Sequence, residues 1–152
     1  MGSMETQKFD YVIIGAGPAG LSSAQYAARG GLKTVVLECA SFGGQVMQIT
    51  ELENYPGIFP AVNGTDFIES MRKQAESFGA KIVQVTVSSI DKKGNDFVVK
   101  TKDCEYTAPF LCIATGAVHR NLEVPGEKEL TGRGVSYCAV CDGPFFRNRK
   151  IV

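Results

Sequence analysis

A glycine-rich segment, Gly15-Ala16-Gly17-Pro18-Ala19-Gly20, constrains the fold of this chain more than any other feature. It follows a continuous apolar run, residues 11–14, which is typical of a parallel strand buried on both faces. It precedes a helical pattern over residues 21–29, and a second apolar run follows at 34–37. The segment therefore predicts a strand–helix–strand unit and an α/β, Rossmann-like fold.

The same segment predicts a dinucleotide site. Gly15 permits the tight turn out of the strand, Gly17 lets the backbone approach a pyrophosphate, and Gly20 lets the helix pack close to the strand. Glu38 stands eighteen residues after Gly20, where a carboxylate can hold ribose hydroxyls and disfavours a 2′-phosphate. The expected ligand is FAD or NAD. The alternative is a plain strand–turn–helix with Glu38 at the surface.

A second motif, Cys138-Ala139-Val140-Cys141, is followed by Asp142. Two cysteines at this spacing can form and open a disulfide, because one thiolate attacks a partner and the second resolves the product. Asp142 is either a proton donor and acceptor for the sulfurs or a helix cap. We expect no metal site, because structural zinc needs four ligands and the only histidine, His119, is expected at the surface. The other alternative to a redox pair is that Cys138 and Cys141 are inert thiols.

Composition narrows the class of protein. Sixteen basic and sixteen acidic residues balance, so a nucleic-acid partner is not expected. No apolar run approaches the ~20 residues that span a bilayer, and the expected location is the cytoplasm. Thiols stay reduced there unless they carry out redox chemistry. The remaining cysteines, Cys39, Cys104 and Cys112, are expected to be apolar packing residues.

The middle of the chain predicts further elements. Residues 40–64 are loop-rich, and a helix then begins near Asp66, capped by Asp66 with Glu69, and ends at Gly79. Its expected apolar face comprises Ile68, Met71, Ala75 and Phe78. An antiparallel meander is expected from strands at 83–87, 97–101 and 104–107, with a polar turn at 91–96. A buried strand at 110–113, a connector at 118–134 and the start of a strand at 149–152 complete the prediction.

Five segments in this order resemble the bacterial, low-molecular-weight thioredoxin reductases. They are Gly15 to Gly20, Gly43-Gly44-Gln45, Glu53-Asn54-Tyr55-Pro56-Gly57, Ala114-Thr115-Gly116-Ala117 and Gly134 to Gly143. The resemblance implies a three-layer, Rossmann-like FAD-binding fold with an antiparallel β-meander. It assigns residues 4–118 to the FAD-binding domain, and residues 119–152 to a connector and the start of an NADPH-binding domain that carries the dithiol.

The resemblance also implies roles for particular residues. The FAD-binding set would be Gly15, Gly17, Pro18, Ala19, Gly20, Glu38, Gly43, Gly44, Gln45, Thr50, Asn54, Val87, Ala114, Thr115 and Gly116. NADPH would reduce FAD, and FAD would reduce the disulfide. Cys141 would face the flavin, Cys138 would attack the disulfide of thioredoxin, and Asp142 would be the acid–base residue. The family works as a homodimer.

One departure from the family shapes the expectation for function. The family's chains are about twice as long, the usual two-domain range, and no second glycine fingerprint follows Gly20 here. The chain therefore resembles a truncated thioredoxin reductase with weakened FAD affinity and without NADPH turnover. The alternatives are a related flavoprotein disulfide reductase that serves a peroxiredoxin or uses ferredoxin, and a non-catalytic dinucleotide-binding module.

Overall fold

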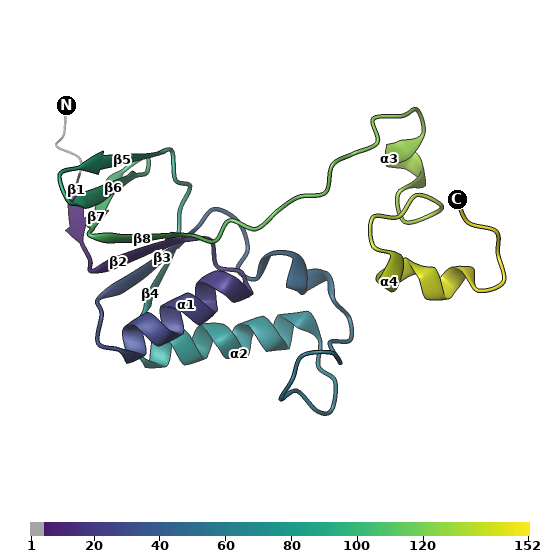
Figure 1. Ribbon diagram of the computed structural model, residues 1–152, viewed down its shortest axis with the longest axis horizontal. Coiled ribbons are helices and arrows are strands. Elements are labelled where there is room, and N and C mark those ends of the chain that lie inside the picture. The colour runs from purple at the N-terminus through teal and green to yellow at the C-terminus, as the bar shows by residue number, and fades with distance from the viewer. Residues whose placement is uncertain (1–4) are drawn as a thin grey trace. The chain divides into compact units, whose positions relative to one another are not determined.

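The computed structural model describes residues 5–152, apart from the side chains of Val140, Cys141 and Pro144. The chain divides into two compact units, Met1–Gly116 and Ala117–Val152, called here the first and the second unit. The first unit contains both sheets and the two long helices, and the second contains only short helical turns (Figure 1).

A four-stranded parallel sheet forms the centre of the first unit. Its strands, in the order β4-β3-β2-β8, are β4 (Lys81–Gln84), β3 (Thr34–Glu38), β2 (Tyr11–Ile14) and β8 (Phe110–Ile113). Helix α1 (Pro18–Arg29) connects β2 to β3, which confirms the predicted strand–helix–strand unit. The helix begins three residues earlier than predicted, because Pro18 fits the first helical turn, where no backbone donor is needed.

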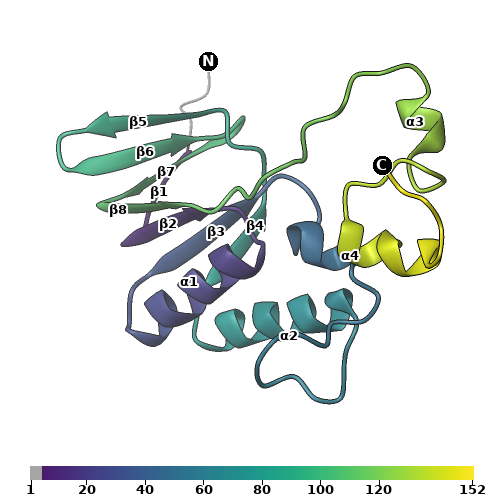
Figure 2. The same ribbon diagram turned by 45° about the vertical axis from the view of Figure 1, so that its right-hand side comes forward.

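Two hydrophobic clusters on opposite faces of this sheet create three layers. Successive side chains of a strand point to opposite faces, so Ile13 and Val36 join the cluster that contains residues of α1 and α2 (Gly64–Ser77). Val12 and Leu37 join the cluster that faces the other sheet. Helices therefore cover one face and a second sheet covers the other (Figures 1 and 2). The predicted three-layer α/β class is confirmed.

The second sheet has the order β1-β7-β6-β5. Its strands are β1 (Glu5–Lys8), β7 (Cys104–Ala108), β6 (Asp96–Lys100) and β5 (Ser89–Lys93). Strands β5, β6 and β7 form an antiparallel meander, and β1 pairs with β7 in parallel. The meander is present, but the prediction of its first strand was wrong.

Residues 83–87 do not belong to the meander. Their first part lies in β4, which pairs in parallel with β3, and Val83, Val85 and Val87 pack into the cluster between the sheets. The expected turn at 91–96 is present but shorter, at residues 94–95, because residues 91–93 belong to β5 and Asp96 begins β6. Strand β5 is exposed along its whole length, so it shows none of the apolar alternation on which a sequence-based assignment depends.

Helix α2 is capped by Asn63, not by Asp66 as predicted. The Asn63 side-chain oxygen accepts a hydrogen bond from the Asp66 backbone N–H at 2.8 Å, and its amide donates to the Asp66 carboxylate at 2.7 Å. Glu69 pairs with Arg72 at 2.8 Å instead of completing a cap. Gly79 follows the helix with φ +98°, as its predicted stop requires, but Phe78 is 41% exposed and does not join the apolar face.

The remaining elements are short. The predicted loop at 40–64 contains a 3-10 turn, η1 (Gly44–Gln48). In the second unit, α3 (Glu127–Leu130) interrupts the predicted connector, and α4 (Ala139–Asp142) continues into the 3-10 turn η2 (Gly143–Phe146). The strand predicted at 149–152 was wrong, because these residues pair with no other strand in the described part of the chain.

Candidate functional site

The glycine loop lies at the carboxyl end of β2, an inner strand of the parallel sheet. Strand β3 lies on one side of β2 and β8 on the other. Ligands of open α/β sheets bind in the crevice outside the carboxyl ends of such strands. The Ala114 N–H donates to the Ile14 carbonyl at 2.8 Å, which places residues 114–116 beside the glycine loop.

Gly15 and Gly20 are required by close backbone contacts. Gly15 has φ +105°, and a Cβ there would lie 2.3 Å from the Ala114 carbonyl oxygen. A Cβ on Gly20 would lie 1.9 Å from the Gly15 carbonyl oxygen and 3.4 Å from Ile13. The distances of 2.3 Å and 1.9 Å to carbonyl oxygens are shorter than non-bonded atoms tolerate, so these two glycines let strand, helix and loop approach one another.

Gly17 differs from these two glycines, because its surroundings are open. Its φ is −76°, which any residue adopts, and the nearest atom to a Cβ there, the Gly43 carbonyl oxygen, is 4.0 Å away. Gly17 is the N-cap of α1, and no side chain caps the helix there. The first N–H groups of α1 are thus left for another acceptor, in a space that a side chain at position 17 would occupy.

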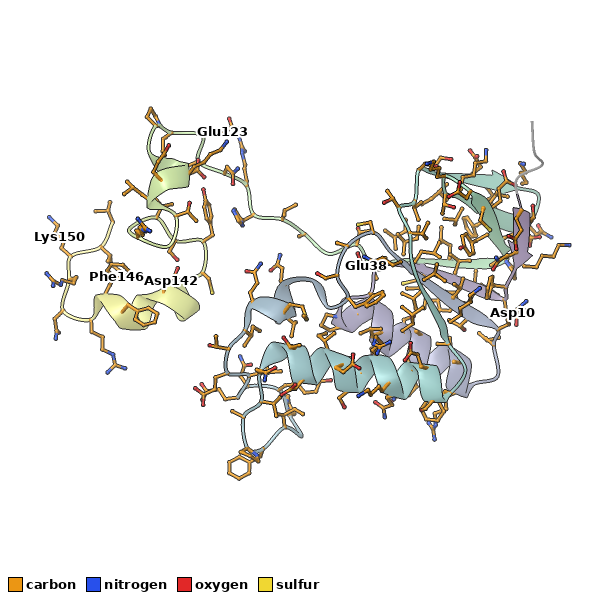
Figure 3. The ribbon with its side chains drawn as sticks, turned by 180° about the vertical axis from the view of Figure 1, so that it is seen from behind. Asp10, Glu38, Glu123, Asp142, Phe146 and Lys150 are labelled. Atoms are coloured by element: carbon orange, nitrogen blue, oxygen red, sulfur yellow. The ribbon has the colours of Figure 1, made fainter. Side chains whose placement is uncertain are left out.

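Glu38 ends β3 and organises the loops around the strand ends. Its carboxylate accepts hydrogen bonds from the Ala16 N–H at 2.7 Å and the Ala40 N–H at 3.0 Å. Burial alone would raise the pKa of Glu38, but these backbone donors outweigh it and lower the pKa below its ordinary value of 4.5. Figure 3 shows Glu38 at the opposite end of the strands from Asp10.

The Gly43-Gly44 turn packs against the glycine loop. The Gly43 N–H donates to the Ala16 carbonyl at 2.9 Å, and both glycines have positive φ, +115° and +57°. Gln45 is exposed on the following turn, η1. A Cβ on Gly64 would lie 1.8 Å from the Val46 carbonyl oxygen, so η1 also rests closely on the start of α2. This supporting role of Gly64 was not predicted from the sequence.

The structure brings together most of the predicted cofactor-binding residues, but not all of them. Hydrogen bonds and close backbone contacts join the glycine loop, Glu38, Gly43-Gly44 and residues 114–116 in one region. Thr50 and Asn54 are exposed between η1 and α2, and Val87 follows β4. These three have no hydrogen bond to the glycine loop within the described residues. The backbone donors of Ala16 and Ala40, which hold Glu38, were not predicted.

The dithiol segment lies in the second unit. Cys138 is exposed and takes part in a disulfide, whereas Cys39, Cys104 and Cys112 are free thiols. The Cys138 carbonyl accepts from the Asp142 N–H at 3.0 Å, and its own N–H donates to the Ser136 hydroxyl at 3.1 Å. The side chain of Cys141, the predicted partner of Cys138, lies outside the described residues. Burial raises the pKa of the Cys104 thiol, as for a packing residue.

Asp142 and His119 complete the predicted residues of the second unit. Asp142 is partly buried at the junction of α4 and η2 and makes no side-chain capping bond there. His119 is exposed, and its ring stacks on Tyr137 with centroids 3.8 Å apart. Among the described residues, no cluster of three or more His, Cys, Asp or Glu side chains could hold a metal ion. No described helix is both long and apolar enough to cross a bilayer.

The sequence matches the family model of the pyridine nucleotide-disulphide oxidoreductases over residues 9–152, and the chain belongs to this family. A curated thioredoxin reductase from Treponema pallidum is 51% identical over 149 residues, which are 98% of this chain and 48% of the relative. The predicted resemblance to thioredoxin reductases is thereby confirmed.

Solved structures agree with the family assignment. The thioredoxin reductase of Lactococcus lactis superposes with a TM-score of 0.75 at 46% identity, covering 92% of this chain and 46% of that one. A ferredoxin-flavin thioredoxin reductase from Clostridium acetobutylicum has a TM-score of 0.68 at 29% identity, covering 93% of this chain and 49% of that one. The chain thus spans about half the length of the relatives it matches.

Proposed function

We propose that this chain forms the FAD-binding and dithiol-carrying part of an NADPH-dependent thioredoxin reductase. The observation that carries the proposal is the open space at Gly17, beside an uncapped helix N-terminus and the ionised Glu38. A disulfide at the exposed Cys138 of a Cys-x-x-Cys motif supports the redox part. Family membership and the likeness to thioredoxin reductases point to the same chemistry.

The residues at the strand ends fit FAD. The space at Gly17 admits a pyrophosphate against the N–H groups that begin α1. The Glu38 carboxylate accepts from the Ala16 and Ala40 N–H groups and from the Cys39 thiol, and its remaining acceptor capacity can hold ribose hydroxyls. The proposed binding set is the one implied by the resemblance: Gly15, Gly17, Pro18, Ala19, Gly20, Glu38, Gly43, Gly44, Gln45, Thr50, Asn54, Val87, Ala114, Thr115 and Gly116.

The bound flavin would supply two-electron reduction of the Cys138–Cys141 disulfide. In the reduced chain, the Cys138 thiolate attacks a disulfide of the partner, and one partner sulfur leaves as a thiolate. Cys141 then attacks Cys138 in the mixed disulfide, which releases the second partner thiol and restores the chain's disulfide. The exposure of Cys138 suits this attack. Asp142 would take and return the proton.

The remaining features of the proposal concern the whole protein. The partner disulfide would belong to a thioredoxin, the electron source would be NADPH, and the protein would act as a homodimer in the cytoplasm. No second glycine fingerprint follows Gly20, so we expect the 152-residue chain alone to show no NADPH oxidation coupled to thioredoxin reduction.

Ferredoxin is the alternative to NADPH as the electron donor. The likeness to a ferredoxin-flavin thioredoxin reductase keeps reduction by ferredoxin open, although its identity, 29%, is well below the 51% of the curated relative. A peroxiredoxin in place of thioredoxin would use the same dithiol. Assays of the complete protein with each donor and each partner separate these cases. The disulfide at Cys138 argues against a non-catalytic module with spectator thiols.

Two glycine variants test where FAD binds. Gly17→Ala adds a methyl group to open space, so we expect unchanged thermal stability and FAD affinity weakened at least about tenfold, ~1.4 kcal/mol. Gly20→Ala forces a backbone collision, so we expect loss of stability together with loss of binding. Fluorescence titration with FAD and thermal unfolding measure both effects. Unchanged FAD affinity in Gly17→Ala would remove the glycine loop from the proposed site.

A further inference from the structure

The buried carboxylate of Glu127 is the centre of a hydrogen-bond network in the second unit. Glu127 is only 8% exposed and is the first residue of α3. A buried charged group needs compensating partners. Its two oxygens accept from the Leu122 N–H at 3.1 Å and the Glu123 N–H at 2.7 Å, so the carboxylate holds the turn before α3 (Figure 3, where Glu123 is labelled).

Tyr137 connects this network to the dithiol. Its hydroxyl donates to the Glu127 carboxylate and also accepts from the Leu122 N–H at 3.1 Å. The other end of the side chain is held as well, because its ring stacks on His119 with an interplanar angle of 19°. Tyr137 is therefore fixed at both its ring and its hydroxyl, ten residues along the chain from Glu127.

Tyr137 immediately precedes Cys138 in the sequence, so its contacts restrict the backbone of the dithiol segment. The Cys138 carbonyl accepts the first backbone hydrogen bond of α4, from Asp142. The Cys138 N–H is held in turn by the Ser136 hydroxyl. An ordered backbone on the amino side of Cys138 limits where its sulfur can go, and it raises the effective concentration of one thiol toward the other.

We infer that Glu127 and Tyr137 are a positioning pair, which fixes the backbone leading into Cys138 and thereby favours the disulfide over the dithiol. The inference rests on the proposed redox role of Cys138 and Cys141. Neither residue of the pair needs to touch a substrate. Their contribution lies in the equilibrium in which the dithiol and glutathione disulfide give the chain's disulfide and two molecules of glutathione.

The test measures this equilibrium in the purified 152-residue chain. The chain is incubated in buffers of reduced and oxidised glutathione, and alkylation followed by peptide mass spectrometry reports the oxidation of residues 138–141 separately from the three free cysteines. For Tyr137→Phe we expect the equilibrium constant for oxidation to fall about 3- to 10-fold, which corresponds to ~14–30 mV. Tyr26→Phe, on the exposed face of α1, is the matched control and should shift nothing.

Variants of Glu127 separate positioning from general damage. Glu127→Ala should shift the equilibrium in the same direction as Tyr137→Phe, and Glu127→Gln, which keeps an acceptor oxygen, should shift it less. The Tyr137→Phe/Glu127→Ala double variant should shift it less than the sum of the two single variants, because both remove one interaction. A Tyr137→Phe constant equal to that of the control would overturn the inference and leave the proposed function standing. Failure of the unaltered chain to exchange with glutathione would instead overturn the proposed function, and the inference with it.

Discussion

Different forces stabilise the interior of each of the two units. Among the described residues of the first unit, twenty buried hydrophobic residues, from Phe9 to Ala108, form two clusters on the faces of one sheet. Among the described side chains of the second unit, the only buried one is the charged Glu127. The first unit therefore depends on apolar burial, whereas the second depends on hydrogen bonds around one carboxylate and on a disulfide.

This difference suits the two proposed tasks. A cofactor site gains from a rigid support, and close packing lets strand ends and helix start keep their positions. A dithiol that forms and opens a disulfide gains from a small segment whose order can be changed by a few polar contacts.

The largest effect should come from a cavity in the first unit. Leu37 is 1% exposed and lies between the two sheets. Leu37→Ala should lower the free energy of unfolding by about 2–5 kcal/mol, measured by thermal and denaturant unfolding. Leu130→Ala, at a position 49% exposed in the second unit, is the control and should cost far less. Equal costs for the two variants would contradict the contrast between the units.

A smaller and local effect is expected at Glu127. Glu127→Ala leaves the Leu122 N–H, the Glu123 N–H and the Tyr137 hydroxyl without their shared acceptor. We expect the second unit to lose about 1–3 kcal/mol of local stability. Amide hydrogen exchange should speed up in residues 122–142 and stay unchanged in β2 and β3. Faster exchange in the parallel sheet would show that the two units do not respond separately.

Loss of the α2 cap should cost less again. Asn63→Ala removes the side chain that accepts from the Asp66 N–H, so we expect the first unit to lose about 1 kcal/mol. Thr65→Ala, at the exposed neighbouring position, should leave the melting temperature almost unchanged. A loss in Asp66→Ala that clearly exceeds the loss in Asn63→Ala would restore Asp66 as the cap.

The smallest effect should be a dependence on pH at Glu38. Its folded pKa lies below 4.5, so the stability it contributes is fully present above pH 4.5 and is lost as the pH falls through the folded pKa. Unfolding of the unaltered chain and of Glu38→Gln is compared from pH 7 to pH 3. The difference between them should shrink below pH 4.5. A difference that grows on acidification would contradict the assigned hydrogen bonds.

The parts of the fold that were predictable are those with apolar signals. The continuous runs at 11–14 and 34–37 are buried parallel strands because both of their faces are covered. The run at 110–113 is a parallel strand as well, but the prediction that it is buried was wrong, because β8 lies at the sheet edge and Phe110 and Ile113 are exposed. Strands β1 and β5 were missed because most of their residues are polar and exposed. These segments form strands through pairing with β7 and β6, which leaves no apolar pattern in their own sequences. The alternation at 83–87 resembled a meander strand, although β4 is an edge strand of the parallel sheet.

The candidate site was predictable to a similar degree. The glycines and Glu38 were predicted from a motif in which each position has a known structural role in dinucleotide binding. The sequence did not distinguish Gly15 and Gly20, which backbone contacts require, from Gly17, which stands in open space. The pairing of Glu127 with Tyr137 also left no signal, because neither residue type at that spacing is unusual and the pairing depends on the turn between them.

The absorbance spectrum of the purified chain with FAD tests whether a flavin-binding unit and a redox dithiol share this chain. We predict a bound flavin spectrum that dithionite bleaches and NADPH does not, with two thiols per chain gained when the disulfide is reduced. Failure to bind FAD would contradict the flavin site, bleaching by NADPH would reveal a nicotinamide site in these residues, and no gain of thiols would contradict the redox pair.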